Sequence, residues 1–271
     1  MTAAIFEPSE RLKSFVECYW NLEATLASTP IINHIVPDGT MKLIFHYGDT
    51  YRYHPPLGHA YLLPKCFLIG QLTRPFVVEP TGFTGSFVVR FHPHGFLPFS
   101  TIPFKQILNK AIPIEQLFGE KGHQLGQRIL FSKNHEERIQ IMEAFLLDRL
   151  ANTTVTDSIV ASAIATFRDT HGILLVQTYS HQIDVHRKQL TRKLSSNTGL
   201  TPKQLAKTLR IQSALNSLLK NQVSSLTDLA YENEYFDQSH FIKDFKAFTG
   251  ITPKAFDEGY LKMSLIFDTL K

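Results

Sequence analysis

Two histidines one residue apart, His92 and His94, stand in the segment FHPHGF. Imidazoles at such spacing can hold a divalent metal ion. A barrel-type metal site would also need a carboxylate a few residues later and a further histidine, but the next acid is Glu115 and the next histidine is His123. The spacing therefore predicts a surface turn and no metal site. The remaining N-terminal histidines are scattered and predict none either: His34, His46, His54 and His59.

The two cysteines, Cys18 and Cys66, form no CxxC pair and no other metal-binding spacing. A nucleophilic cysteine needs a basic neighbour that lowers its pKa, and Cys18 lies in the apolar run FVECYW without one. The sequence also has no GxSxG, HExxH or glycine-rich phosphate loop. We therefore expect no catalytic residue and no cofactor.

A different chemistry is suggested by the segment VHRKQLTRKL at residues 185–194. If it is helical, Leu190 and Leu194 form a buried stripe, and the opposite face is polar or basic. Arginine suits the O6 and N7 atoms of guanine, and lysine suits guanine or a phosphate. The candidate DNA-binding residues of this segment are Arg187, Lys188, Thr191 and Arg192.

The segment has a second copy 51 residues later, in which Phe241 and Phe245 take the places of the two leucines. Glutamine can pair bidentately with adenine, and an isoleucine can touch the methyl group of thymine. The candidate DNA-binding residues of the second copy are Gln238, Ser239, Ile242 and Lys243.

The elements around these segments repeat as well. Ser180 and Ala230, at an offset of 50, are small residues on a preceding short helix, and each copy ends in GLTPK or GITPK. A small residue lets a second helix cross the first closely, as a helix-turn-helix requires. The changed offset predicts a turn one residue longer in the second copy, and leucine spacing predicts a long joining helix over 202–220. A plain helical bundle is the alternative, and the repeated turn chemistry argues against it.

The stretch YFDQSHFIKDFKAFTGITPKAF resembles the C-terminal signature of AraC/XylS-type transcription regulators. In that family a Gly-aromatic turn is followed by D-x-S-x-F, F-K, G-x-T-P and an aromatic residue. The resemblance covers 157–258, implies two DNA-binding helix-turn-helix units, and places Lys188, Thr191 and Arg192 where the family reaches bases. One departure is that Asp184 and Glu234 replace the turn glycine, which predicts a strained or differently shaped second turn.

Charge supports this division. Residues 1–159 hold 14 Lys and Arg against 14 acids, and residues 160–271 hold 14 against 10, so the whole net charge of +4 lies in the second part. Within it, 170–210 contains seven basic residues against Asp184 alone, whereas 222–258 contains three against seven acids. A solvated surface is the alternative reading of the overall bias. Because phosphates dominate DNA affinity, we expect the first unit to hold the DNA and the second to add orientation.

The first hundred residues are β in character, with short β-branched and aromatic runs at 31–36, 41–47, 67–70, 76–80 and 85–91. A helix is expected over 9–17, short helices after Pro98, a longer one over 134–151, and an interdomain linker at 151–158. The region 7–120 resembles a domain of uncharacterised role that often precedes AraC-type modules, on ECYWNLE, VPDGTMKLIFHYGD, LIGQLTRPF and VRFHPHGFLPF. Five aromatic residues are either pocket walls or ordinary core: Trp20, Phe45, Tyr47, Phe87 and Phe91.

The expected fold is α+β with two domains: a β-barrel or sandwich-like domain with flanking helices at 1–151, and an all-α domain at 157–271. The expected function is sequence-specific DNA binding by a cytoplasmic transcription regulator. Its partner is the major groove of double-stranded DNA. A small-molecule effector and a homodimer, through the helix at 134–151, stay open, and no membrane contact is expected. The rivals are a methyl-transfer repair protein or other enzyme that the helical module localises, and a protein-binding helical module.

Overall fold

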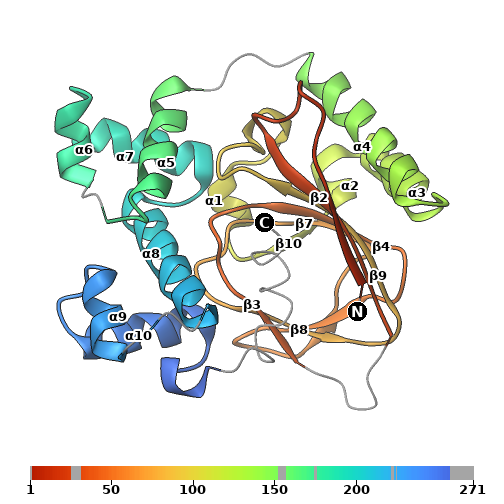
Figure 1. The fold of residues 1–271 in the computed structure, drawn as a ribbon. Helices are drawn as coiled ribbons and strands as arrows, with labels where there is room; N and C mark the ends of the chain where they lie inside the picture. The colour runs from red at the N-terminus through yellow and green to blue at the C-terminus, as the bar shows by residue number, and fades with distance from the viewer. Residues whose placement is uncertain are drawn as a thin grey trace. The chain divides into compact units, whose positions relative to one another are not determined.

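The computed structural model describes residues 2–25, 32–151, 157–173, 176–220, 223 and 225–256. The chain divides into two compact parts. The N-terminal part comprises 1–32, 40–71 and 77–156, and the C-terminal part comprises 33–39, 72–76 and 157–271. The architecture is the expected α+β type with two domains, in which a β-rich part is followed by an all-helical part (Figure 1). Most of the expected linker, 152–156, lies outside the described residues.

The N-terminal part contains two sheets. The six-stranded sheet has the order β1 (Thr2–Phe6), β2 (Val16–Ala24), β9 (Thr84–Phe91), β4 (Lys42–His46), β7 (Cys66–Ile69) and β10 (Ala111–Pro113). The four-stranded sheet has the order β3 (Asn33–Ile35), β8 (Phe76–Pro80), β5 (Tyr51–His54) and β6 (Tyr61–Leu62). All five strands expected from β-branched runs are present, as β3, β4, β7, β8 and β9.

The helix expected over 9–17 is wrong. Residues 10–15 form a tight turn, in which the Val16 amide donates to the Leu12 carbonyl at 2.8 Å, and Val16 already begins β2. The reason is topological, because β1 and β2 are antiparallel, with Phe6 opposite Tyr19, so the short connection must reverse the chain. Leu12 and Val16 are buried in this turn as they would be in a helix, which is why their spacing misleads.

Helices cover one face of the six-stranded sheet (Figure 1). They follow the short α1 (Phe104–Ile107) and are α2 (Ile114–Phe118), α3 (Glu120–Leu130) and α4 (His135–Leu150). Asn134 caps α4 by accepting a hydrogen bond from the Glu137 amide at 2.9 Å, as expected. Met142 and Leu146 of α4 are buried in this core, so that face of the helix packs on its own domain.

Three of the five aromatic residues that could have been pocket walls belong to the same core: Phe45, Phe87 and Phe91. Trp20 is also buried, with Arg90 5.5 Å from its ring. Tyr47 is half-buried and donates from its hydroxyl to Glu23 Oε1 at 2.8 Å. The packing therefore supports a role for these residues as ordinary core and not as pocket walls.

The C-terminal part is helical in every described element from Asp157 onward, apart from turns. Its helices are α5 (Ser158–Asp169), α6 (Val176–Gln182), α7 (Arg187–Thr198), α8 (Pro202–Leu219), α9 (Leu226–Glu232) and α10 (Gln238–Thr249). The long helix α8 joins the group α5–α7 to the pair α9–α10 (Figure 1). Asp157 caps α5 and Thr201 caps α8, both through side-chain oxygens that accept backbone amides, as the sequence predicts.

Candidate nucleic-acid interface

The two helix-turn-helix units are copies of each other at the level of single hydrogen bonds. Helices α7 and α10 both have 12 residues, and α6 and α9 both have seven. The Val185 amide donates to the Ser180 carbonyl at 3.0 Å, and 50 residues later the Tyr235 amide donates to the Ala230 carbonyl at 2.9 Å. The predicted repeat is therefore a structural repeat, with the same turn closing the first helix of each unit.

The turn residues that replace the family's glycine do adopt the left-handed backbone, with φ of 51° at Asp184 and 57° at Glu234. A side chain in this region is strained, more so for Glu than for Asp. The sequence predicts a strained or differently shaped second turn: the positive φ of Glu234 bears out the strain, and the hydrogen bonds of the two turns correspond up to Tyr235. What differs is one extra residue afterwards, Phe236, before the N-cap of α10.

The small residues of the first helices are buried where the second helices cross them. The side chain of Ser180 is 5% exposed and Ala230 is fully buried. Leu190 and Leu194 of α7, and Phe241 and Phe245 of α10, are fully buried, as their spacing predicts. Because these positions are equivalent at an offset of 51, both second helices turn the same face to their cores.

None of the eight sequence-predicted residues is fully buried, but Ile242 packs partly against the core of its unit. Arg187, Lys188 and Arg192 are exposed on α7, and Thr191 is half-buried; Ser239 and Lys243 are exposed on α10, and Gln238 and Ile242 are half-buried. The offset of 51 pairs them one to one, with Arg187 matching Gln238, Lys188 matching Ser239, Thr191 matching Ile242 and Arg192 matching Lys243. Each unit thus presents a four-residue face of the same geometry and different chemistry.

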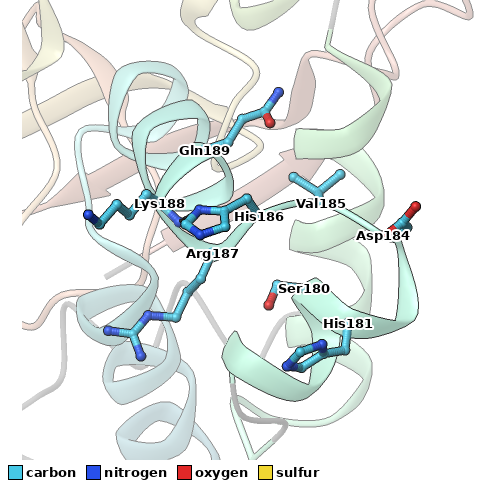
Figure 2. Close-up of a pocket in the computed structure, with 8 residues that line it drawn as sticks. All are labelled: Ser180, His181, Asp184, Val185, His186, Arg187, Lys188 and Gln189. Carbon is cyan, nitrogen blue, oxygen red and sulfur yellow. Dashed lines mark hydrogen bonds between the residues drawn. The ribbon is translucent and has the colours of Figure 1, made fainter.

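An open hollow lies beside this face in the first unit, between α6 and the start of α7 (Figure 2). Arg187 and Lys188 line it from α7, and His181 lines it from α6. Histidine is not among the preferred N-cap residues, yet His186 caps α7: its Nδ1 accepts from the Lys188 amide at 3.2 Å. His186 and Gln189 are exposed lining residues that spacing alone did not single out.

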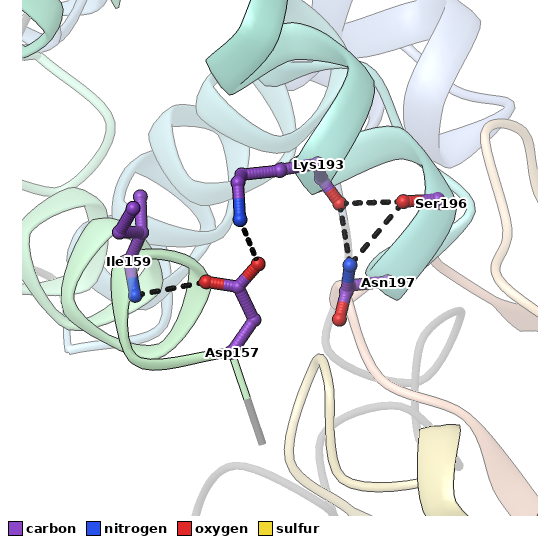
Figure 3. Close-up of polar contacts among 5 residues, drawn as sticks. All are labelled: Asp157, Ile159, Lys193, Ser196 and Asn197. Atoms are coloured by element: carbon purple, nitrogen blue, oxygen red, sulfur yellow. Dashed lines mark hydrogen bonds and ion pairs between the residues drawn. The ribbon is translucent and has the colours of Figure 1, made fainter. Parts of the chain in front are cut away.

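Three of the seven basic residues that the sequence assigns to the first unit are engaged inside the domain. Lys193 forms an ion pair with Asp157 (Figure 3), and Lys207 Nζ lies 2.7 Å from Asp244 Oδ1. The guanidinium of Arg210 lies 5.0 Å from the ring centre of Tyr235. Within the described ranges, Arg187, Lys188 and Arg192 make no such ion pair, so the basic surface of the first unit is concentrated on α7.

The ion pair of Lys193 ties the start of α5 to the helix that carries the basic face. The same Asp157 carboxylate accepts from the Ile159 amide at 3.1 Å, so one side chain caps α5 and anchors α7 (Figure 3). The hydrogen bond from Lys193 holds the pKa of the Asp157 carboxyl below its usual range. This contact links the N-terminus of α5 to α7.

The described histidines and cysteines of the N-terminal part are not arranged as a metal site. Over the described part of the chain, no group of three or more His, Cys, Asp or Glu side chains is arranged to hold a metal ion. His92 lies in the turn after β9, where its Nε2 is 3.0 Å from the Lys13 carbonyl oxygen. Cys66 is buried, and burial raises the pKa of its thiol to about 12. No helix among the described residues is long and apolar enough to cross a bilayer.

Comparison with known families matches both parts of the chain. Residues 4–113 match a domain of unknown function (DUF6597), and residues 179–259 match a helix-turn-helix domain, a match that begins within α6 and continues past the end of α10. The C-terminal domain is an AraC-type helix-turn-helix domain. The match to the AraC-type domain and the DUF6597 match in front of it confirm the resemblance that the sequence motifs indicate.

Among curated proteins, the chain is 25% identical over 127 residues to the HTH-type transcriptional activator RhaS of Escherichia coli K12 / DH10B. This alignment covers 47% of the chain and 38% of RhaS, so the chain spans well under half the length of that relative. Among solved structures, ToxT of Vibrio cholerae gives a TM-score of 0.49 at 11% identity, covering 92% of this chain and 98% of ToxT. The C-terminal domain of the response regulator AraT of Geobacillus stearothermophilus gives a TM-score of 0.35 at 20% identity. This match covers 41% of this chain and 88% of the AraT domain.

Proposed function

We propose that this chain is a sequence-specific DNA-binding transcription regulator in which α7 and α10 are the two recognition helices. The observation that supports the proposal is the repeated face, in which four equivalent positions of each helix lie outside its fully buried stripe, although Ile242 packs partly on the core. A recognition helix enters the major groove with its N-terminal residues on base edges. Arg187, Lys188, Thr191 and Arg192 then read one stretch of groove, and Gln238, Ser239, Ile242 and Lys243 read a second.

The two units contribute unequally in this proposal. Arg187, Lys188 and Arg192 place three cations on the face of α7, whereas Lys243 is the one cation among the four equivalent positions of α10. Affinity for DNA comes largely from neutralising phosphates, so the first unit supplies most of it. The second unit supplies orientation and base contacts through uncharged groups.

The N-terminal domain, with its boundary at 151–157, is proposed to modulate DNA binding by sensing a small molecule or by forming a homodimer. A ligand or partner that favours one arrangement of the two reading helices would act by shifting populations. We place the regulator in the cytoplasm, with the DNA it reads. A methyl-accepting role for Cys66 is disfavoured, because such a cysteine needs a lowered thiol pKa and burial raises that of Cys66.

The experiment is selection of bound DNA from a random pool by the purified full-length chain, followed by affinity measurements on the enriched sequence. Arg192→Ala is expected to lower affinity by roughly 5- to 150-fold, the range for loss of a bidentate contact to guanine. Lys243→Ala is expected to lower it less. Each lost phosphate contact should also reduce the slope of log K against log salt concentration by about 0.9.

The matched control is Lys105→Ala, which removes a cation from an exposed position of the N-terminal domain. It should leave both affinity and salt slope unchanged. Failure to enrich any motif at moderate salt contradicts the proposal as a whole. A larger loss at Lys243 than at Arg192 contradicts the division of labour between the units.

A further inference from the structure

The second unit has one residue without a counterpart in the first. Up to Tyr235 the units correspond at an offset of 50, since the Tyr235 amide repeats the bond of the Val185 amide. From the N-caps onward they correspond at 51, since Asp237 caps α10 as His186 caps α7. The inserted residue is therefore Phe236, between Tyr235 and the N-cap Asp237.

The side chain of Phe236 is 87% exposed, whereas its neighbour Tyr235 is 2% exposed and packs edge-on against Phe241. Burying a phenyl ring is worth roughly 1.5–3 kcal/mol, which the folded domain does not gain at this position. A single exposed aromatic residue is unremarkable by itself. Phe236, however, lies next to the N-terminal end of α10, which the proposed function places in the major groove, so its side chain would be close to the DNA.

The chemistry of the second unit points to an apolar contact. The segment 222–258 has seven acids against three basic residues, and Lys207 already pairs with Asp244. After the N-cap Asp237, the first two residues of α10 are uncharged: Gln238 is half-buried and Ser239 is exposed. A unit poor in cations gains little from phosphates, so base contacts carry a larger share of its energy. The apolar group that a base presents in the major groove is the methyl group of thymine, and phenylalanine is one of the side chains that pack on it.

We propose that Phe236 is a specificity-determining residue that packs on a thymine methyl group in the stretch read by α10. This inference rests on the proposed function, because it needs α10 in the major groove. It adds a base contact that the first unit lacks, at the point where the repeat is broken. The insertion thus makes the second helix-turn-helix unit differ from the first in its base contacts as well as in its charge.

The test replaces each thymine of the selected sequence, one at a time, with deoxyuridine, which lacks only the methyl group. Wild-type full-length protein is expected to lose about fourfold in affinity at one thymine of the second stretch, the value of one buried methyl-sized group. Phe236→Ala should bind the thymine and deoxyuridine forms of that position equally. Because Phe236 is exposed, the variant is expected to fold, and its melting temperature checks this.

The matched control is Tyr231→Ala, which removes an aromatic side chain that is 60% exposed on α9 of the same unit. It should keep the full thymine preference. If the selected sequence binds and Phe236→Ala retains the preference, or weakens every DNA equally, the inference is overturned while the proposed function stands. If the full-length chain enriches no sequence, the proposed function fails and this inference fails with it.

Discussion

Replacement of Asp157 tests how much a single carboxylate contributes to holding α5 and α7, the proposed recognition helix, together. Asp157 caps α5 through the Ile159 amide and pairs with Lys193 of α7 (Figure 3). Asparagine keeps a capping oxygen but loses the charge, and alanine loses both. The two substitutions therefore separate the cap from the ion pair.

The expected magnitudes follow from burial. The side chains of Asp157 and Lys193 are 24% and 28% exposed, so their pairing is screened less than a surface ion pair. A hydrogen bond between charged groups contributes about 1.5–3 kcal/mol when well shielded, and exposed pairs contribute about 0.2–1 kcal/mol. We expect Asp157→Asn to cost about 1–1.5 kcal/mol, between those limits. Asp157→Ala should cost about 1 kcal/mol more, the usual value of an N-cap.

The assay is hydrogen exchange at the amides of α5 and α7 in the full-length chain, which gives local opening free energies where a two-domain melting curve does not. Asp157→Asn, Lys193→Met and the double variant form a cycle whose coupling energy is the ion pair. The control is Asp237→Asn, which makes the same change at another aspartate N-cap, that of α10. A coupling energy near zero, or an equal loss at Asp237, would refute the reasoning.

The pH dependence of the same pair has a defined sign. Lys193 lowers the pKa of Asp157 in the folded state, so the contribution is fully present above the unfolded value of about 3.9 and is lost as pH falls through the folded value. The difference in opening free energy between wild type and Lys193→Met should therefore shrink at acid pH. A constant difference down to pH 2 would contradict the assignment.

Three further substitutions and one chemical measurement test individual features. Glu234→Gly should stabilise the second helix-turn-helix unit by about 0.5–1 kcal/mol as measured by hydrogen exchange, because φ is 57° there. Asp184→Gly should stabilise the first unit less, because Asp tolerates this backbone better. Ala230→Leu should destabilise by about 1–3 kcal/mol, because Ala230 is fully buried under the crossing helix; an unchanged melting temperature would contradict that packing. Cys66 should be alkylated at pH 8 only as fast as the domain opens, because burial raises the pKa of its thiol to about 12, and rapid alkylation of native protein would revive the enzymatic alternative.

The sequence by itself determined the C-terminal domain almost completely. Local signals decide a helix-turn-helix: a cap such as Asp237, a buried small residue such as Ala230, and apolar residues at i and i+4 such as Phe241 and Phe245. All these act within about 20 residues of chain, so periodicity and capping rules predict them. The repeat made the prediction stronger, because it placed the same signals twice.

Only the tertiary structure decided the pairing of distant residues. β2 was missed and 9–17 was predicted as a helix, because the chain reversal that pairs β1 with β2 depends on a partner strand that local spacing does not reveal. In the same way, the sequence counts Lys193 and Lys207 as basic surface. The structure pairs each of them with a carboxylate, 36 and 37 residues away in the chain. The exposure of Phe236 beside a buried Tyr235 is of this kind too, since which neighbour turns inward is set by packing rather than by composition.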